Sequence, residues 1–205
     1  MSETCNRRQK CEKTRYLERE KCIFHCDKLN FDANDIQQFW HQLRDEYNIS
    51  GVYGINQDKV FEGISFPKFQ NAHRYPFNFF SNNNRLERIF TFKKCVFFDD
   101  VDFTNVQINR NIIFEECVFY GDLKTNTANE IEIKNCEFKK EITALRCKNL
   151  NISNSKFINN VLFIVGKEVK LIQAVFRKKF EIRGSSILES RYVKLSLINQ
   201  FLLII

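Results

Sequence analysis

One pattern of hydrophobic and polar positions recurs along the second half of the chain. It reads apolar–x–apolar–x–x–small–x–apolar, and successive copies start nineteen residues apart. The copies are "IIFEECVF" at 112–119, "IEIKNCEF" at 131–138, "LNISNSKF" at 150–157 and "VKLIQAVF" at 169–176. Alternation of apolar and polar positions is typical of a strand with one buried face. In the first copy the two polar residues Glu115 and Glu116 are enough to turn a corner, so the pattern predicts short strands joined at corners.

Two further sets of residues keep the same interval. Leu123, Ile142, Val161 and Phe180 form a third apolar position, and Ala128, Cys147, Gly166 and Ser185 form a small one. A unit this short cannot bury its own apolar face, so copies must stack on one another. Three short strands per unit are too little for a propeller blade or a helix pair, and they fit one turn of a β-helix. We expect Phe119, Phe138, Phe157 and Phe176 to stack in one row, beside a row of Cys117, Cys136, Ser155 and Ala174. The alternative is a β-sandwich with accidental periodicity.

An earlier copy, "FTFKKCVF" at 90–97, lies twenty-two residues before the copy at 112. Its turn has apolar pairs at Cys95/Phe97, Val101/Phe103 and Val106/Ile108, spaced by five or six. This rhythm, with a small residue two places before a central Phe, resembles the pentapeptide-repeat proteins over about residues 86–190. The resemblance implies a mainly β fold: a right-handed parallel β-helix of roughly quadrilateral section with the Phe and the small residue pointing inward.

The copy at 188–195, "LESRYVKL", is degraded, and "QFLLII" follows it. An uncapped solenoid end exposes unpaired backbone and apolar side chains. We therefore expect either self-association through the C-terminal end or a chain that is shortened relative to its relatives.

Residues 31–48 change to a helical period. Ile36, Phe39, Trp40, Leu43 and Tyr47 fall on one stripe. Asp32 is the expected N-cap, with Asp35 three residues on. We expect this helix to cover the first open turn, because a cap blocks edge-to-edge pairing. Residues 51–85 are interpreted as a connector with one or two irregular strands around "ISF" at 64–66. The expected organisation is a Cys/His module at 1–30, the capping helix and connector at 31–85, and the β-helix at 86–205.

The N-terminal module carries the metal hypothesis. Thiolate and imidazole are preferred Zn²⁺ ligands, and four of them close a tetrahedral structural site. The most economical set is Cys5, Cys11, Cys22 and His25, with Cys26 as a substitute for His25. A structural Zn²⁺ would order a segment too short and charged to fold by apolar burial. Free thiols and redox or nucleophilic cysteine chemistry are the alternatives. The arrangement is similar to short modules ending "CIFH" that precede pentapeptide repeats in some microbial proteins.

Composition narrows the class of protein. The chain of 205 residues has 22 Phe but only 6 Gly and 2 Pro, which disfavours many tight hairpins. No apolar run reaches about twenty residues, so no membrane-spanning helix is expected. The start, "MSETCNRRQKCEK", lacks the apolar core of a secretory signal. We therefore expect a cytoplasmic protein with reduced thiols. Cys95, Cys117 and Cys136 are interpreted as compact inward-facing fillers.

No arrangement of residues predicts catalysis. Asp99, Asp100 and Asp102 form the only tight acidic cluster, with Asp122 near the same corner one turn later. Asp is common at turns, so we interpret these residues as solvated corner positions. His41 and His73 have no evident partner, and no phosphate loop or HExxH motif is present. We therefore expect no enzyme and no small-molecule substrate.

Two functions remain. The first is a scaffold that binds another protein, since a rigid solenoid needs little ordering on binding. One corner supports it by passing from acidic at Asp99 and Asp100 to basic at Arg177, Lys178 and Lys179. The alternative is nucleic-acid binding through late basic turns and the N-terminal cations Arg7, Arg8, Lys10, Lys13 and Arg15. The net charge of +7 argues against the acidic, DNA-like surface of some pentapeptide-repeat proteins.

Overall fold

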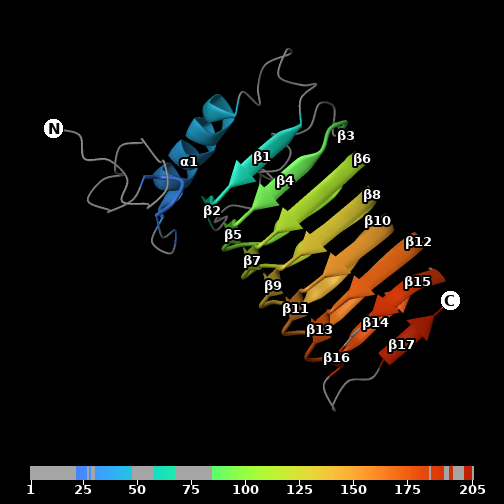
Figure 1. The fold of residues 1–205 in the computed structure, drawn as a ribbon. Coiled ribbons are helices and arrows are strands. Elements are labelled where there is room, and N and C mark those ends of the chain that lie inside the picture. Colours follow the sequence, from blue (N-terminus) through green and yellow to red (C-terminus); the bar gives the residue numbers. More distant parts are fainter. Residues whose placement is uncertain are drawn as a thin grey trace.

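The computed structural model describes residues 22–26, 28, 31–47, 58–67, 85–184, 186–191, 194–195 and 201–204. For Arg44, Asn105 and the residues from 186 onward, only the backbone is described. Within these ranges the protein is a parallel β-solenoid with one helix, α1 (Ala33–Glu46), at the N-terminal side (Figure 1). The mainly β fold expected from the repeat is confirmed.

Each turn of the solenoid combines a longer strand with a strand of two residues. The longer set is β1 (Lys59–Glu62), β4 (Phe90–Lys93), β6 (Val101–Glu115), β8 (Leu123–Lys134), β10 (Ile142–Ser153), β12 (Val161–Ile172), β14 (Phe180–Arg183) and β17 (Phe201–Ile204), which pair in this order. At its sides, β3 (Arg85–Leu86) pairs with β6 and β15 (Ser186–Arg191) with β12. The short set is β2 (Ser65–Phe66), β5 (Val96–Phe97), β7 (Val118–Phe119), β9 (Glu137–Phe138), β11 (Lys156–Phe157), β13 (Val175–Phe176) and β16 (Lys194–Leu195), which also pair in order. All pairings are parallel, so Figure 1 shows a stack of similar rungs.

The expected row of Phe side chains runs through the interior. Phe119 stacks on Phe138 with ring centroids 4.3 Å apart, and Phe157 lies 4.8 Å from both Phe138 and Phe176. The row continues toward the N-terminus through Phe97 and Phe66, at 4.7 and 4.8 Å. Offset aromatic pairs contribute about 0.5–1.5 kcal/mol each beyond the burial of their area. The row therefore stabilises the successive interfaces between turns from Phe66 to Phe176 through the same contact.

A left-handed residue makes the corner inside the five copies of the pattern between residues 90 and 176. The fifth position has φ between 49° and 55° in Lys94, Glu116, Asn135, Asn154 and Gln173. The first four of these residues donate their backbone N–H to a carbonyl of the following turn, as Lys94 does to Glu115 O at 2.8 Å. Side chains other than Gly cost energy in this region, with Asn the best tolerated. The stacking of turns thus holds a strained corner in place.

Helix α1 begins and packs as its sequence predicts. The Asp32 carboxylate accepts from the backbone N–H groups of Asn34 and Asp35, and the Asp35 side chain accepts from the Asp32 N–H, which completes a capping box. On the inner face, Phe39 and Trp40 both lie 5.9 Å from the ring of Phe66. The helix therefore covers the rung formed by β1 and β2.

That first rung is a further copy of the repeated pattern, and it lies within residues 51–85, which we interpreted as a connector. "KVFEGISF" at 59–66 pairs with 90–97, Phe61 opposite Phe92 and Phe66 opposite Phe97. The pattern was hidden because Lys59 and Ile64 replace an apolar and a small residue. Gly63 takes the left-handed corner with φ of 66°. The solenoid therefore includes residues well before the expected start at 86.

Candidate functional site

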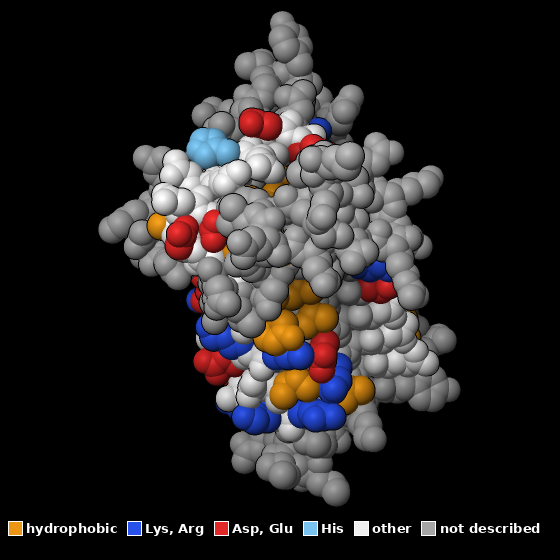
Figure 2. Space-filling view, turned by 90° about the vertical axis from the view of Figure 1, so that its left-hand side faces the viewer, with side chains coloured by type: hydrophobic (Ala, Val, Ile, Leu, Met, Phe, Trp, Pro, Cys, Tyr) orange, Lys and Arg blue, Asp and Glu red, His pale blue; other side chains and the backbone are white. Residues whose placement is uncertain are grey.

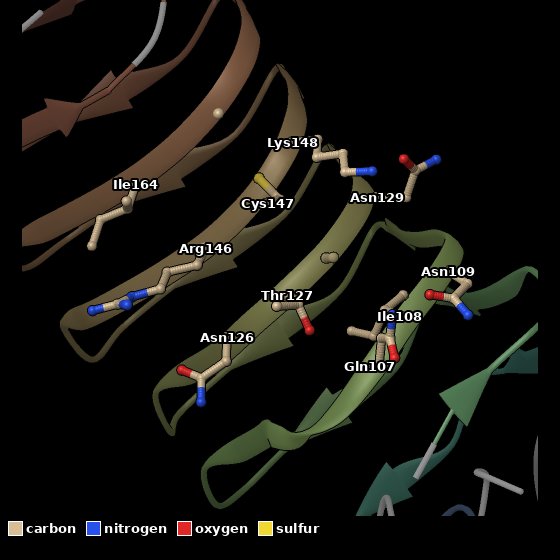
Figure 3. A pocket seen from close by; sticks show the side chains of 12 residues that line it. Gln107, Ile108, Asn109, Asn126, Thr127, Asn129, Arg146, Cys147, Lys148 and Ile164 are labelled. Carbon is tan, nitrogen blue, oxygen red and sulfur yellow. The ribbon is translucent and has the colours of Figure 1, made fainter. Parts of the chain in front are cut away.

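A groove of about 420 Å³ lies where four neighbouring long strands bend (Figure 3). Its small residues are Ala128, Cys147 and Gly166, three members of the small set seen in the sequence. Its other lining residues are Gln107, Ile108 and Asn109 from β6, Asn126, Thr127 and Asn129 from β8, Arg146 and Lys148 from β10, and Ile164 from β12. Among the described residues, the lining is therefore mostly polar and contains two cations and no carboxylate.

Irregular pairing creates this bend. Between β10 and β12 the register shifts before Leu145 and again after Cys147, so that Cys147 lies opposite Val165 and not Gly166. The β6–β8 pair shifts on both sides of Ile108. A register shift bends a strand and increases its twist locally. The small residues recur every nineteen positions, as predicted, but the shifts place them along a bend instead of in one straight row.

The two cations of the groove have no partner within the described part of the chain. Neither the Arg146 guanidinium nor the Lys148 ammonium makes an ion pair or a hydrogen bond there. Elsewhere on the solenoid, cations commonly pair with carboxylates: Lys93 with Glu115, Lys94 with Glu116, Lys124 and Lys140 with Asp100, Lys134 with Glu132, Lys156 with Glu137, and Lys179 and Arg183 with Glu181. The groove thus carries two positive charges that no described carboxylate neutralises.

The backbone that carries Arg146 is held from inside. Thr125 is buried, and its hydroxyl donates to Arg146 O at 2.6 Å and accepts from Arg146 N–H at 3.0 Å. In Figure 3, Asn126 and Arg146 lie toward one end of the bend, whereas Asn109, Asn129 and Lys148 lie toward the other. This site was not predicted from the sequence, because the repeat marks the small residues but not the polar residues around them.

The groove does not contain an activated nucleophile. Burial, with a smaller contribution from the negative charge of Glu130, raises the pKa of Cys147 to about 12. A thiol is nucleophilic as the thiolate, so this side chain is inert near neutral pH. Both carboxylate oxygens of Glu130 accept hydrogen bonds, from the amides of Asn111 at 2.9 Å and Asn151 at 2.7 Å. Glu130 is therefore held by these amides beside the groove and is not part of its lining.

The acidic cluster is a structural network. Asp122 is 1% exposed, and its backbone N–H donates to Asp100 Oδ1 at 2.9 Å. The same Asp100 carboxylate accepts from Lys124 and Lys140, at 2.9 and 2.8 Å. The Thr143 hydroxyl donates to Asp122 Oδ2. The expectation of solvated corner residues is wrong for Asp122, because the backbone of the next turn and Thr143 bury it.

Two carboxyl groups in this network shift in opposite directions. Partial burial opposes ionisation of Asp100, but hydrogen bonds from Lys140, the Asp122 N–H and Lys124 outweigh it and lower the pKa to about 2. Burial raises the pKa of Asp122, and its hydrogen bonds from Thr143 offset only part of that effect. Asp100 is thus a firmly ionised anchor for two lysines and not a proton donor.

The stacked cysteines do more than fill space. Cys95 Sγ donates to Phe61 O at 3.2 Å, Cys117 Sγ to Phe92 O at 3.2 Å, and Cys136 Sγ to Phe114 O at 3.4 Å. In the next copy Ser155 donates to Ser153 O at 2.8 Å. Burial raises the pKa of Cys95 and of Cys136. These inward positions therefore favour a small side chain that can also donate to a corner carbonyl.

The structure describes part of the expected zinc ligand set. Cys22 Sγ lies 3.1 Å from His25 Nδ1, so these two side chains are close enough to hold one ion. Cys26 Sγ instead lies 3.4 Å from the Nζ of Lys28, which is 1% exposed. Among the described residues no three His, Cys, Asp or Glu form a cluster suited to a metal. Cys5 and Cys11, His73 and the N-terminal cations lie outside the described residues.

The charged corner that follows each stacked Phe is described from Phe98 to Lys179. Phe98 stacks on Tyr120 at 5.5 Å, and the Lys139 ammonium lies 4.5 Å from the Tyr120 ring centroid. On the face shown in Figure 2, acidic, basic and hydrophobic side chains are intermixed over the solenoid. Many charged side chains at this corner therefore contact residues of neighbouring turns.

Comparison with known proteins gives no relative to guide assignment: no family model, curated protein or solved structure matches the chain. In the ranges that the structure describes, the helix is too short and polar to cross a bilayer.

Proposed function

We propose that this protein is a non-catalytic scaffold of the pentapeptide-repeat type that binds another protein. The observation that carries the proposal is the groove at the bend, which is lined by amides and by two cations that have no partner among the described residues. A solenoid whose turns are fixed by stacked rings loses little freedom on binding, so contact energy is not spent on ordering the surface. A groove of this size also lies within the range of ordinary binding sites.

Two observations favour binding over catalysis. The carboxylates of the acidic cluster bind lysines and backbone, with Asp100 strongly ionised by those contacts. The thiols described within the solenoid are buried, and the one that lines the groove has a raised pKa. General acid–base and nucleophilic chemistry need a group that is both accessible and tuned near the working pH.

A photo-crosslinking experiment tests this proposal. A benzophenone amino acid at Thr127, which lines the groove, should capture a defined protein in lysate that has been treated with nuclease. The matched control places the same group at Thr91 in β4, away from the groove. Capture of the same proteins at both positions, or loss of capture after nuclease treatment, would contradict protein binding through the groove. In the second case, filter binding at two salt concentrations would test nucleic-acid binding, whose affinity falls steeply with salt.

We further propose that Cys22 and His25 are two ligands of a structural Zn²⁺ whose remaining ligands are Cys5 and Cys11. The 3.1 Å approach of Cys22 Sγ and His25 Nδ1 supports a shared ion. The same chemistry requires a thiolate and a neutral imidazole, and bound metal would stabilise the fold of the N-terminal module. Cytoplasmic location and self-association through the C-terminal end also stay predictions.

A further inference from the structure

We infer that the groove at the bend binds a short extended peptide that carries two consecutive acidic residues. This inference rests on the proposed function, and it adds the chemistry of the bound segment. Charge complementarity carries it: the two cations of the lining are unpaired among the described residues, and no carboxylate lines the groove.

The dimensions of the groove suit an extended chain that crosses the turns. The groove spans four neighbouring strands, β6, β8, β10 and β12. Paired strands lie about 4.8 Å apart, so the groove is about 14 Å long, and an extended peptide covers that length with about four residues. Gln107, Thr127 and Asn129 offer both donors and acceptors to a peptide backbone.

The placement of the cations specifies the acidic pair. Arg146 and Lys148 are both exposed on β10 but extend toward opposite ends of the bend in Figure 3. Successive side chains of an extended peptide also point to opposite sides. One acidic residue would therefore reach Arg146 and the next would reach Lys148. The planar guanidinium of Arg146 can bind a carboxylate through two parallel hydrogen bonds.

A nucleic acid fits the same groove less well. Single strands are bound mainly by aromatic stacking platforms together with many phosphate contacts. The lining contains no aromatic residue and two cations. The amides that make up most of its polar lining match peptide groups better than a continuous polyphosphate.

Fluorescence anisotropy with defined probes tests the inference on the full chain. The probe is a labelled octapeptide with a central Glu-Asp pair flanked by Gly and Ser, and the comparison peptide has Gln-Asn at the centre. We expect the acidic peptide to bind at least about ten-fold more tightly, because each charge-assisted contact is worth about that factor. Arg146→Glu should lose this preference.

Two further variants separate the site from general charge. Gly166 is exposed, and an added Cβ would have its nearest neighbours at 3.8 Å, so Gly166→Leu fills the groove without a clash at that atom. It should weaken peptide binding about ten-fold or more without lowering the thermal midpoint. Lys178→Glu makes the same charge change as Arg146→Glu but lies outside the groove, and it should bind like the parent chain.

Three results would overturn the inference. They are equal binding of the acidic and amide peptides, unchanged binding in both Arg146→Glu and Gly166→Leu, and tighter binding of an eight-nucleotide oligothymidylate than of the acidic peptide. The crosslinking experiment at Thr127 does not depend on the charge of the partner. A protein captured there, together with failure of the acidic peptide, would therefore reject this ligand chemistry and leave the proposed function standing.

Discussion

The ammonium of Lys140 lies 2.8 Å from the carboxylate of Asp100, although forty residues separate the two in sequence. Lys124, on the turn between them, donates to the other oxygen of the same carboxylate at 2.9 Å. One acidic side chain thus ties three successive turns together along a corner. Several charges that share one partner hold it better than an isolated surface pair does.

This network makes stability depend on pH. The folded-state pKa of Asp100 is depressed to about 2, so its contribution is fully present above the ordinary value near 4 and is lost as pH falls toward 2. Solvent screening of this partly exposed group limits the contribution to about 1 kcal/mol. Urea unfolding of the parent and of Asp100→Asn should differ by that amount at pH 6 and converge near pH 2. A difference that stays constant over this range would contradict the assigned role.

Gly121 should tolerate no side chain. A Cβ there would lie 2.1 Å from the backbone carbon of Asp99 and 2.3 Å from the nitrogen of Asp100. Because backbone atoms of the adjacent turn cannot move aside, Gly121→Ala should lower the free energy of unfolding by about 3 kcal/mol or more. Gly166→Ala is the matched control, and chemical denaturation should place it within about 0.5 kcal/mol of the parent. Similar stability of the two variants would show that the corner is looser than described.

The left-handed corner offers a stabilising change. Gln173 has φ of 53° and an exposed side chain. Gln173→Gly relieves the left-handed penalty but adds flexibility to the unfolded chain, so a net gain of about 0.5–1 kcal/mol is expected. Lys170→Gly, in the extended part of β12, should instead lose about 0.5–1 kcal/mol. Thermal and urea unfolding measured on both variants check the sign, and a loss at both positions would refute the strain at Gln173.

The inward small row should accept a hydroxyl but not a larger apolar group. Ser155 already occupies this row and donates to the carbonyl two residues earlier, as Cys136 does to Lys134 O. Cys136→Ser should therefore cost about 1 kcal/mol or less, whereas Cys136→Leu should cost about 1–3 kcal/mol through overpacking. The raised pKa of Cys136 also predicts that Ellman's reagent modifies it only on unfolding. Rapid modification of the folded chain would contradict its burial.

The zinc proposal predicts about one ion per chain after a stripped sample is reloaded. Cys22→Ser and His25→Asn should each reduce bound zinc, and Cys26→Ser should not, since Cys26 Sγ faces Lys28. Elemental analysis with a thermal shift measures both occupancy and its effect on folding. Much less than one ion in the reloaded parent, or equal loss in all three variants, would remove the assignment.

The sequence predicted the repeat well because stacked turns repeat their chemistry. The row from Phe119 to Phe176 could be predicted because the same residue recurs at a fixed interval. The N-cap Asp32 could be predicted because capping is a local signal. The first rung was missed where that identity fails, at Lys59 and Ile64. Its corner residue, Gly63, was a usable signal, because Gly is the residue best suited to a left-handed position.

The groove could not be predicted in the same way. It depends on register shifts next to Cys147 and Ile108, and a shift arises from how two turns fit and not from either sequence alone. That Arg146 and Lys148 have no partner among the described residues is likewise a property of three-dimensional spacing. Burial of Asp122 was missed for a related reason, since the partners that cover it come from the neighbouring turns.

The common contact between rungs has an evolutionary consequence. Ring stacking, the corner hydrogen bond and strand pairing all recur after nineteen residues. A tandem duplication of one such segment would therefore insert a whole turn and keep the pairing and stacking of the neighbouring turns. The solenoid can therefore become longer or shorter by whole turns. Each added turn would also lengthen the groove at the bend, so the length of ligand that the protein contacts could change by gene duplication alone.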